Sequence, residues 1–111
     1  MNIKTFEHPE FGKIRTVEID GKWFMVWDDF AGKLYSPTTI YQAFGNQVER
    51  YASKDSWRKM YVMEIDPMAR WTKLIDRDAL KAIENHLFPR RINLQKFMDL
   101  LNWIYSDILK E

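Results

Sequence analysis

The clearest pattern in the chain is a pair of segments with alternating apolar residues, separated by Asp20-Gly21. Asp-Gly between two such segments is typical of a two-residue turn in a β-hairpin. This turn sets Ile19 opposite Lys22, Val17 opposite Phe24 and Arg15 opposite Val26. One face of the hairpin is then apolar, with Val17, Ile19, Phe24 and Val26. The other face carries Thr16, Glu18, Trp23, Met25 and Trp27, so we expect helices or a binding partner to cover it.

Helix signals follow the hairpin. Asp28 or Asp29 is placed to cap a short helix that ends near Leu34. Ser36-Pro37 predicts the start of a second helix, which ends at Gly45. Asn46, with Glu49 three residues later, then resembles a capping box and predicts a third short helix to about Ser53.

The second half of the chain predicts two short strands followed by two helices. The strands are expected at residues 61–65, stopped by Asp66-Pro67, and at residues 71–75. Asp76 caps a helix that Pro89 ends, and Asn93 caps the longest helix. The apolar stripe of this last helix comprises Leu94, Phe97, Met98, Leu101, Ile104, Tyr105 and Ile108, and Leu100 and Trp103 widen it. The fold class is therefore α+β, with an N-terminal β-hairpin and a small antiparallel sheet packed against several short helices and a longer C-terminal helix.

The segment EFGKIRTVEIDGKWF, followed by DDFAGKL, resembles the N-terminal domain of the BRO family, which occurs in phage antirepressors and in large DNA viruses. The order of features is the same: an FG-x-[IL]-R strand, a D-G turn, a W-F strand, and D-[VF]-A at the start of a helix. Where the family reads L-G-Y, this chain reads Leu34-Tyr35. The resemblance implies a single Bro-N-like domain over residues 1–111 and a phage-type regulatory role without catalysis.

Composition agrees with one small domain of 111 residues, and the starting Met and charged Lys110-Glu111 end favour a complete small protein. The absence of cysteine excludes disulfides and thiolate metal sites. No apolar run has the length of a membrane span, so we expect a cytoplasmic protein, in a bacterial host if it is phage-encoded. The net charge of +1 is low for a dedicated DNA-binding domain, although charged patches matter more than totals.

Residues for catalysis are sparse. His8 and His86 lie far apart, and neither has a second ligand at metal-binding spacing, so we interpret both as surface or capping residues. Asp28-Asp29 stands where a helix begins, which favours a capping or charge–dipole role. No glycine-rich phosphate loop is present. We therefore expect no enzymatic activity, cofactor or metal.

Basic residues mark the candidate nucleic-acid site. The helix–Gly–helix pattern resembles a helix-turn-helix, and Gln47, Arg50 and Lys54 share one face of its second helix. Arg58 and Lys59 extend this group, and such side chains suit base and phosphate contacts in double-stranded DNA. The alternative is a solvated polar face. A second basic group comprises Arg90, Arg91 and Lys96; it is either a solubilising loop or a clamp for phosphate or carboxylate.

Tryptophan residues leave a second function open. Any of Trp23, Trp27 and Trp103 that stays exposed would anchor a protein interface. The wide apolar surface of the last helix indicates either a central position in the fold or a homodimer interface. DNA binding in an antirepressor-like transcription regulator is the leading hypothesis. The alternative is a protein-binding inhibitor of a repressor or of a host defence complex, comparable to anti-CRISPR proteins.

Overall fold

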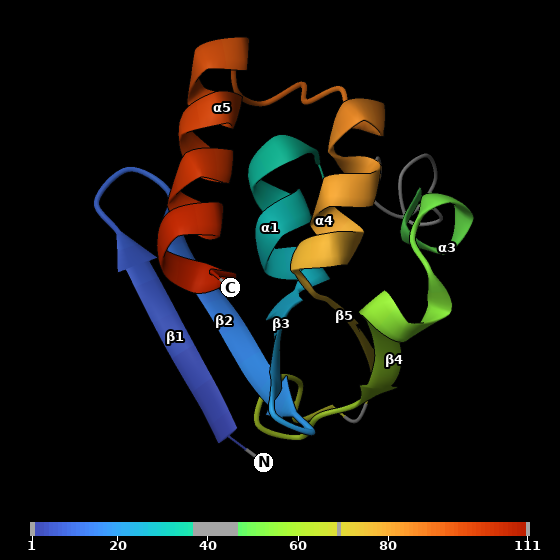
Figure 1. Ribbon diagram of the computed structural model, residues 1–111. Helices are drawn as coiled ribbons and strands as arrows, with labels where there is room; N and C mark the ends of the chain where they lie inside the picture. The colour runs from blue at the N-terminus through green and yellow to red at the C-terminus, as the bar shows by residue number, and fades with distance from the viewer. Residues whose placement is uncertain (1, 37–46, 69, 111) are drawn as a thin grey trace.

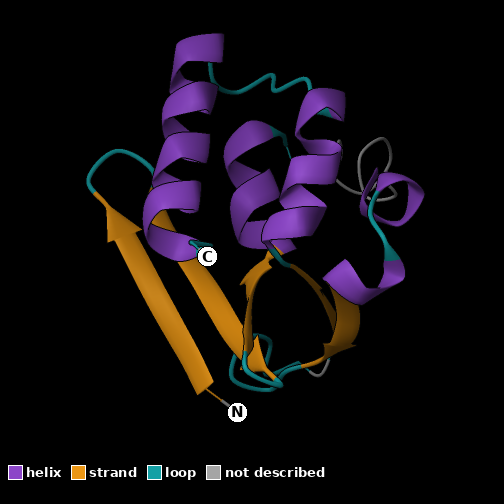
Figure 2. Cartoon of the chain, viewed as in Figure 1, coloured by secondary structure: helices purple, strands orange, loops and turns teal. Residues whose placement is uncertain are grey.

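A five-stranded antiparallel sheet, with strands in the order β1-β2-β3-β5-β4, forms one layer of the protein (Figure 1). The computed structural model describes residues 2–36, 47–68 and 70–110. The strands are β1 (Asn2–His8), β2 (Gly12–Ile19), β3 (Lys22–Val26), β4 (Trp57–Tyr61) and β5 (Trp71–Ile75). Helices cover the sheet, so the α+β class expected from the sequence is confirmed (Figure 2).

The predicted hairpin is formed by β2 and β3. Ile19 pairs with Lys22 and Val17 with Phe24, as the Asp20-Gly21 turn requires. Both turn residues have positive φ, 53° at Asp20 and 79° at Gly21. Such a pair of angles belongs to the primed turns, whose twist matches that of the strands. The predicted register is therefore confirmed at these two pairs.

The first strand, β1, is not predicted by the sequence pattern. It pairs with β2 along its whole length, from Asn2 opposite Glu18 to His8 opposite Gly12. None of its residues is fully buried, and apolar Ile3 and Phe6 are separated by polar residues. An edge strand of this kind lacks the regular alternation that reveals a strand with one buried face.

Three helices lie side by side in Figure 1: α1 (Trp27–Leu34), α4 (Arg77–Ile83) and α5 (Leu94–Trp103), which continues as a π-helical turn over Ile104–Ile108. Short 3₁₀ turns occupy Lys54–Ser56 and Glu84–His86. The predicted caps of α4 and α5 are confirmed, because Asp76 accepts from Ala79 N and Asn93 accepts from Lys96 N. The predicted cap of α1 is wrong: Val26 is its N-cap residue, without a side-chain bond, and Asp28 and Asp29 lie inside the first turn.

The buried face of the last helix differs from the predicted stripe. Leu94 and Met98 are exposed, whereas Leu100 is fully buried. The buried set of this helix and its π-turn is Phe97, Leu100, Trp103, Ile104 and Ile108. The apolar residues of this helix cover a wide arc, so the sequence alone does not specify which part of that arc faces inward.

Two apolar cores lie on opposite faces of the sheet. The larger lies between the sheet and the helices and includes Trp27, Phe30, Leu80 and Leu100. The smaller comprises Val17, Phe24, Val26, Val62, Ile65 and Leu74, so the expected apolar face of the hairpin does pack against other residues. Its cover comes from the loop after β4, where Ile65 N and Asp66 N donate to Val62 O.

The strand predicted at residues 61–65 is therefore wrong, because β4 covers Trp57–Tyr61 and residues 62–65 form a turn. The apolar residues after Tyr61 are explained by burial in the smaller core, not by alternation in a strand. The strand predicted at residues 71–75 is confirmed as β5.

Candidate functional site

The most distinctive surface feature is an exposed aromatic pair at the loop end of the β4–β5 hairpin. Tyr61 ends β4, Trp71 begins β5, and the two residues are directly opposite in the register. Their rings stack with centroids 4.2 Å apart and an interplanar angle of 28°. Tyr61 is nevertheless 52% exposed and Trp71 is 55% exposed. Stacking holds the rings in one geometry while leaving more than half of each residue open to a ligand.

The loop between these strands adds two exposed methionines. Met63 and Met68 are 71% and 76% exposed. We call Tyr61, Met63, Met68 and Trp71 together the aromatic–methionine surface. The loop between the two strands is anchored to the rest of the protein, because Val62 and Ile65 pack in the smaller core and Arg15 Nη1 donates to Ile65 O at 2.9 Å. These contacts fix the position of the loop that carries the exposed Met63 and Met68.

Charged groups surround this surface. Arg70 pairs with Asp66 at 2.8 Å, and Lys73 of β5 pairs with Glu49 at 2.9 Å. The pKa of Asp28 is raised, mainly because the carboxyl group is partly buried and secondly because Asp29 lies beside it. Lys73, Arg15 and Arg70 act in the opposite direction on this pKa. The surface thus has a polar rim of both signs, as protein interfaces commonly do.

The predicted DNA-reading helix is only partly present. Helix α3 covers Gln47–Tyr51, and the helix expected at residues 37–45 lies outside the described residues. Ser53 is extended, with φ −70° and ψ 153°, so Lys54 belongs to a separate 3₁₀ turn. The expectation that Gln47, Arg50 and Lys54 share a face of one continuous helix is therefore wrong.

Gln47 is half-buried, and its Oε1 is buried without a hydrogen-bond partner in the described part of the chain. Arg50 and Lys54 are exposed.

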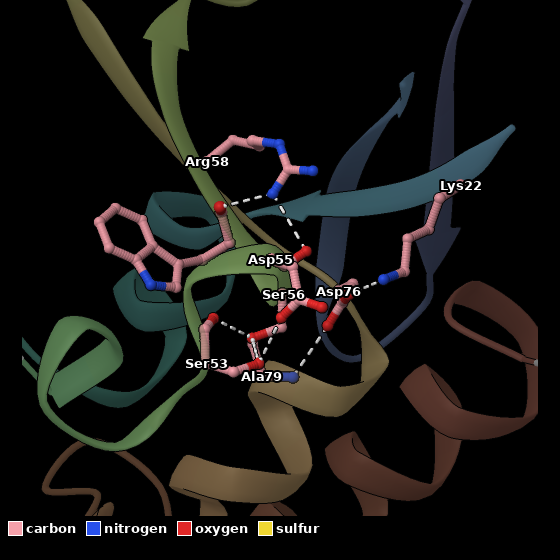
Figure 3. Close-up of polar contacts among 8 residues, drawn as sticks. Lys22, Ser53, Asp55, Ser56, Arg58, Asp76 and Ala79 are labelled. Atoms are coloured by element: carbon pink, nitrogen blue, oxygen red, sulfur yellow. Dashed lines mark hydrogen bonds and ion pairs between the residues drawn. The ribbon is translucent and has the colours of Figure 1, made fainter. Parts of the chain in front are cut away.

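Arg58 and Lys59 have different environments in β4. The Arg58 guanidinium folds back, and its Nη1 donates to Asp55 O at 3.0 Å and to Trp57 O at 2.9 Å (Figure 3). It also lies over the Phe24 ring, 5.1 Å from the centroid. The Arg58 side chain is thus engaged in contacts within the protein, whereas Lys59 is exposed. Of the predicted DNA contacts, Arg50, Lys54 and Lys59 are the accessible cations.

The second basic group serves the fold at two of its three positions. Lys96 pairs with Glu10 at 2.6 Å, and Arg91 Nη1 donates to Gly32 O at 3.0 Å. The backbone N–H groups of Arg90 and Arg91 both donate to Leu34 O. These contacts tie the segment before α5 to α1, and they tie α5 itself to the turn after β1. A clamp using all three side chains would have to break them.

Two of the three tryptophans considered as interface anchors are buried. Trp27 is 1% exposed and belongs to the larger core, and Trp103 is also buried. The Trp103 ring lies 4.9 Å from the His8 ring and 6.3 Å from the Phe11 ring. Trp27 and Trp103 therefore do not meet the condition of exposure on which their role as interface anchors depends. Trp23 is half-buried.

Trp23 lines an open cavity of about 660 Å³ between the hairpin and the ends of α4 and the π-turn. The other lining residues are Lys4, Phe6, Gly21, Lys22, Asp76, Arg77, Asp78, Asp107, Ile108, Leu109 and Lys110. Several of its charges serve one another or the backbone: Lys22 pairs with Asp76 at 2.6 Å, and Arg77 Nη1 donates to Tyr105 O and Leu109 O. The Asp76 side chain is shared between Lys22 and the α4 cap (Figure 3).

The histidines have structural contacts. His8 Nδ1 accepts from the backbone N–H groups of Glu10 and Phe11 in the turn after β1. The His86 ring stacks on Tyr51, with centroids 3.6 Å apart. Among the described residues, no group of three or more His, Cys, Asp or Glu side chains could hold a metal ion. A helix long and apolar enough to cross a membrane is likewise not found in this part of the chain.

Comparison with protein-family models, curated proteins and solved structures finds no match to the chain. The candidate site is therefore identified from the geometry and exposure of its side chains. The sequence pattern does not predict the Tyr61–Trp71 pair, because it places the first of the two strands at residues 61–65 instead of Trp57–Tyr61. The signal was the alternation of Trp57, Lys59 and Tyr61, which mirrors Trp71, Lys73 and Ile75 in the facing strand.

Proposed function

We propose that this chain is a non-enzymatic regulatory protein that binds a protein partner through the aromatic–methionine surface. The observation that carries the proposal is the stacked and exposed pair of Tyr61 and Trp71. Tyr and Trp are enriched among the residues that dominate binding energy at interfaces. Fixed aromatic rings also lose little conformational entropy on binding, because they have few rotatable bonds.

The neighbouring residues fit the same role. Methionine and arginine are enriched at protein interfaces, and this surface places Met63 and Met68 in the loop that carries Arg70. Unbranched methionine side chains adapt to the shape of a partner. The net charge of +1 also suits a protein partner better than a polyanion. The resemblance to the BRO family makes bacterial or phage proteins, such as a repressor or a host defence complex, the first partners to test.

A photo-crosslinking amino acid at position 71 tests this proposal directly. In a bacterial lysate we expect it to form one defined crosslink, and we expect none from position 94. Leu94 is the matched control because it is also apolar and strongly exposed but lies on α5. Trp71→Ser should abolish affinity capture of the crosslinked protein, whereas Leu94→Ser should not. Equal capture by both variants, or no defined crosslink at position 71, would contradict the proposal.

DNA binding is the second candidate function. Arg50, Lys54 and Lys59 favour it, because these three side chains are exposed and make no hydrogen bond or ion pair with the described residues. Cations without partners among the described residues are available to phosphates. A fluorescence-polarisation titration with duplex DNA at two salt concentrations tests this function. Phosphate contacts would lower log K by about 0.9 per log unit of salt for each phosphate. Absence of binding at low salt would exclude it.

A further inference from the structure

Among the described residues, strand β4 is at the edge of the sheet, since the strand order places it beside β5 alone. One side of its backbone pairs with β5, and the other side has no neighbouring strand among the described residues. An edge of this kind can pair with an extended segment of another chain. Whether β4 can do so depends on which of its backbone groups point outward.

The hydrogen-bond pattern identifies these groups. Asp76 N donates to Ser56 O at 3.0 Å, so the Ser56 carbonyl points toward β5. In an antiparallel pair the residues alternate between those bonded to the partner strand and those directed away from it. Arg58 and Met60 therefore direct their N–H and C=O groups at β5. Trp57, Lys59 and Tyr61 direct theirs outward.

One of these outward residues is already occupied. Arg58 Nη1 donates to Trp57 O at 2.9 Å and to Asp55 O at 3.0 Å, which closes this end of the edge (Figure 3). Lys59 and Tyr61 remain, each with one N–H and one C=O group. The open part of the edge thus ends at Tyr61, next to Trp71.

We propose that the open edge of β4 accepts an acidic, extended segment of the partner protein as an additional strand. The inference rests on the proposed protein-binding function and specifies its mode and chemistry. The partner backbone would bond to Lys59 and Tyr61. On the face that these two side chains share with Trp71, an acidic partner residue would lie opposite Lys59 and an apolar one opposite Tyr61. Acidic and apolar residues two positions apart are therefore the expected signature.

The positive charge of Lys59 favours an acidic partner segment over a second copy of the chain at this edge. Lys59 is exposed and has no ion-pair partner among the described residues, so an opposing carboxylate would complement it. Two copies of β4 paired antiparallel would bring their Lys59 side chains opposite each other or to diagonal positions. Like charges at such positions are destabilising. The edge is thus better suited to an acidic partner than to self-association.

Selection of a random dodecapeptide phage library on the full chain tests the proposal. We expect enriched peptides in which Asp or Glu lies two positions from an apolar residue. The consensus peptide is then measured by fluorescence polarisation against Lys59→Ala and Lys59→Pro. Alanine removes the charged side chain beyond Cβ, whereas proline also removes the outward N–H group, a change that edge strands tolerate. Lys59→Pro should bind about tenfold more weakly than Lys59→Ala.

N-methylation of alternate backbone nitrogens in the consensus peptide gives the same test with the protein unchanged. Alternate nitrogens form two sets, and only one set faces β4 in an added strand. N-methylation of that set should weaken binding about tenfold or more, whereas N-methylation of the other set should not. Equal affinity of Lys59→Pro and Lys59→Ala, with both N-methylated peptides binding normally, would overturn strand addition. A lack of enriched acidic peptides, or a protein dimer that Lys59→Pro dissociates, would also overturn it. Trp71→Ser separates the two proposals: if it alone weakens binding, the surface stands and the strand addition fails.

Discussion

Arg15 and Asp29 are joined by three hydrogen bonds that connect β2 to α1. Arg15 N and Nε both donate to Asp29 Oδ2 at 2.9 Å, and Nη2 donates to Oδ1 at 2.8 Å. The remaining Nη1 donates to Ile65 O, so one guanidinium also holds the loop of the aromatic–methionine surface. The hydrogen bond to Asp29 is the main reason that the pKa of Arg15 is raised. A planar fork is required for this geometry, and lysine does not provide it.

Replacement of Arg15 by alanine should lower the free energy of unfolding by about 2 kcal/mol, because a half-buried charged network loses its donor. Arg15→Lys should restore less than half of this loss, since it keeps the charge but not the fork. Urea denaturation measures both values. Hydrogen exchange at Ile65 should also become faster in Arg15→Ala, because the loop loses its anchor.

Lys13→Ala is the matched control for Arg15. Lys13 lies on the same strand and pairs with Glu7 at 3.3 Å, but both side chains are more than two-thirds exposed, at 69% and 68%. Its removal should change stability by less than about 0.5 kcal/mol. Equal effects of Lys13→Ala and Arg15→Ala would show that the Arg15–Asp29 network is not an important contact.

The network illustrates what sequence could and could not predict. The position of Arg15 on the apolar face of the hairpin follows from the predicted register, but its ion-pair partner does not. The sequence predicts that Asp28 or Asp29 caps the helix or interacts with its dipole, because Asp is common at helix starts. Here the Asp29 carboxylate is used by Arg15, which precedes it by 14 residues, and the cap position falls on Val26. Short sequence patterns predict hydrogen bonds between neighbouring residues. Where a side chain could bond either locally or to a residue distant in sequence, the tertiary structure decides which bond forms.

Two glycines should respond to alanine in opposite directions. Gly21 has φ 79° in the hairpin turn, whereas Gly32 lies within α1 without a positive φ, and an added Cβ meets nothing within 4 Å at either position. Gly21→Ala should therefore destabilise the protein by about 1 kcal/mol through backbone strain. Gly32→Ala should stabilise it by about 0.5–1 kcal/mol through helix propensity. Thermal unfolding measures both, and shifts of the same sign would contradict the described backbone.

Tyr105 should make the protein sensitive to alkaline pH. Burial, and then the hydrogen bond to the Glu84 carboxylate, raise the pKa of Tyr105. A raised pKa in the folded state contributes stability that is complete below the unfolded pKa of about 10 and is lost as pH rises above it. The free energy of unfolding of the wild type, minus that of Tyr105→Phe, should fall by about 1.4 kcal/mol per pH unit above 10. Urea titrations at about pH 8 and about pH 11 measure this.

Subtraction of the Tyr105→Phe variant is needed because other groups act in the same direction. The pKa of Lys22 is raised by its hydrogen bond to Asp76, and that of Tyr35 is raised by burial. Both residues are unchanged in Tyr105→Phe, so their contributions cancel in the difference. A difference that stays constant between the two pH values would show that the Tyr105 hydroxyl ionises equally in the folded and unfolded states.

The site was harder to predict than the hairpin for a physical reason. The Asp20-Gly21 turn is specified by two adjacent residues, and its register follows. The Tyr61–Trp71 pair depends on a loop whose Val62 and Ile65 turn into a core on the far face of the sheet. From sequence, these apolar residues extend the strand. Only the three-dimensional position of that core shows that β4 ends at Tyr61 and leaves its ring exposed.

Arg50→Ala and Lys54→Ala test the DNA-binding candidate. Each should weaken binding to duplex DNA and reduce the salt slope by about one, because each removes one phosphate contact. Neither should lower the melting temperature, since both side chains are exposed without partners in the described residues. Lys13→Ala is the control, because Lys13 is an exposed cation on β2 that belongs to neither predicted basic group. Unchanged affinity in both variants, or an equal loss in Lys13→Ala, would remove α3 and the turn after it from the DNA interface and leave protein binding as the function to pursue.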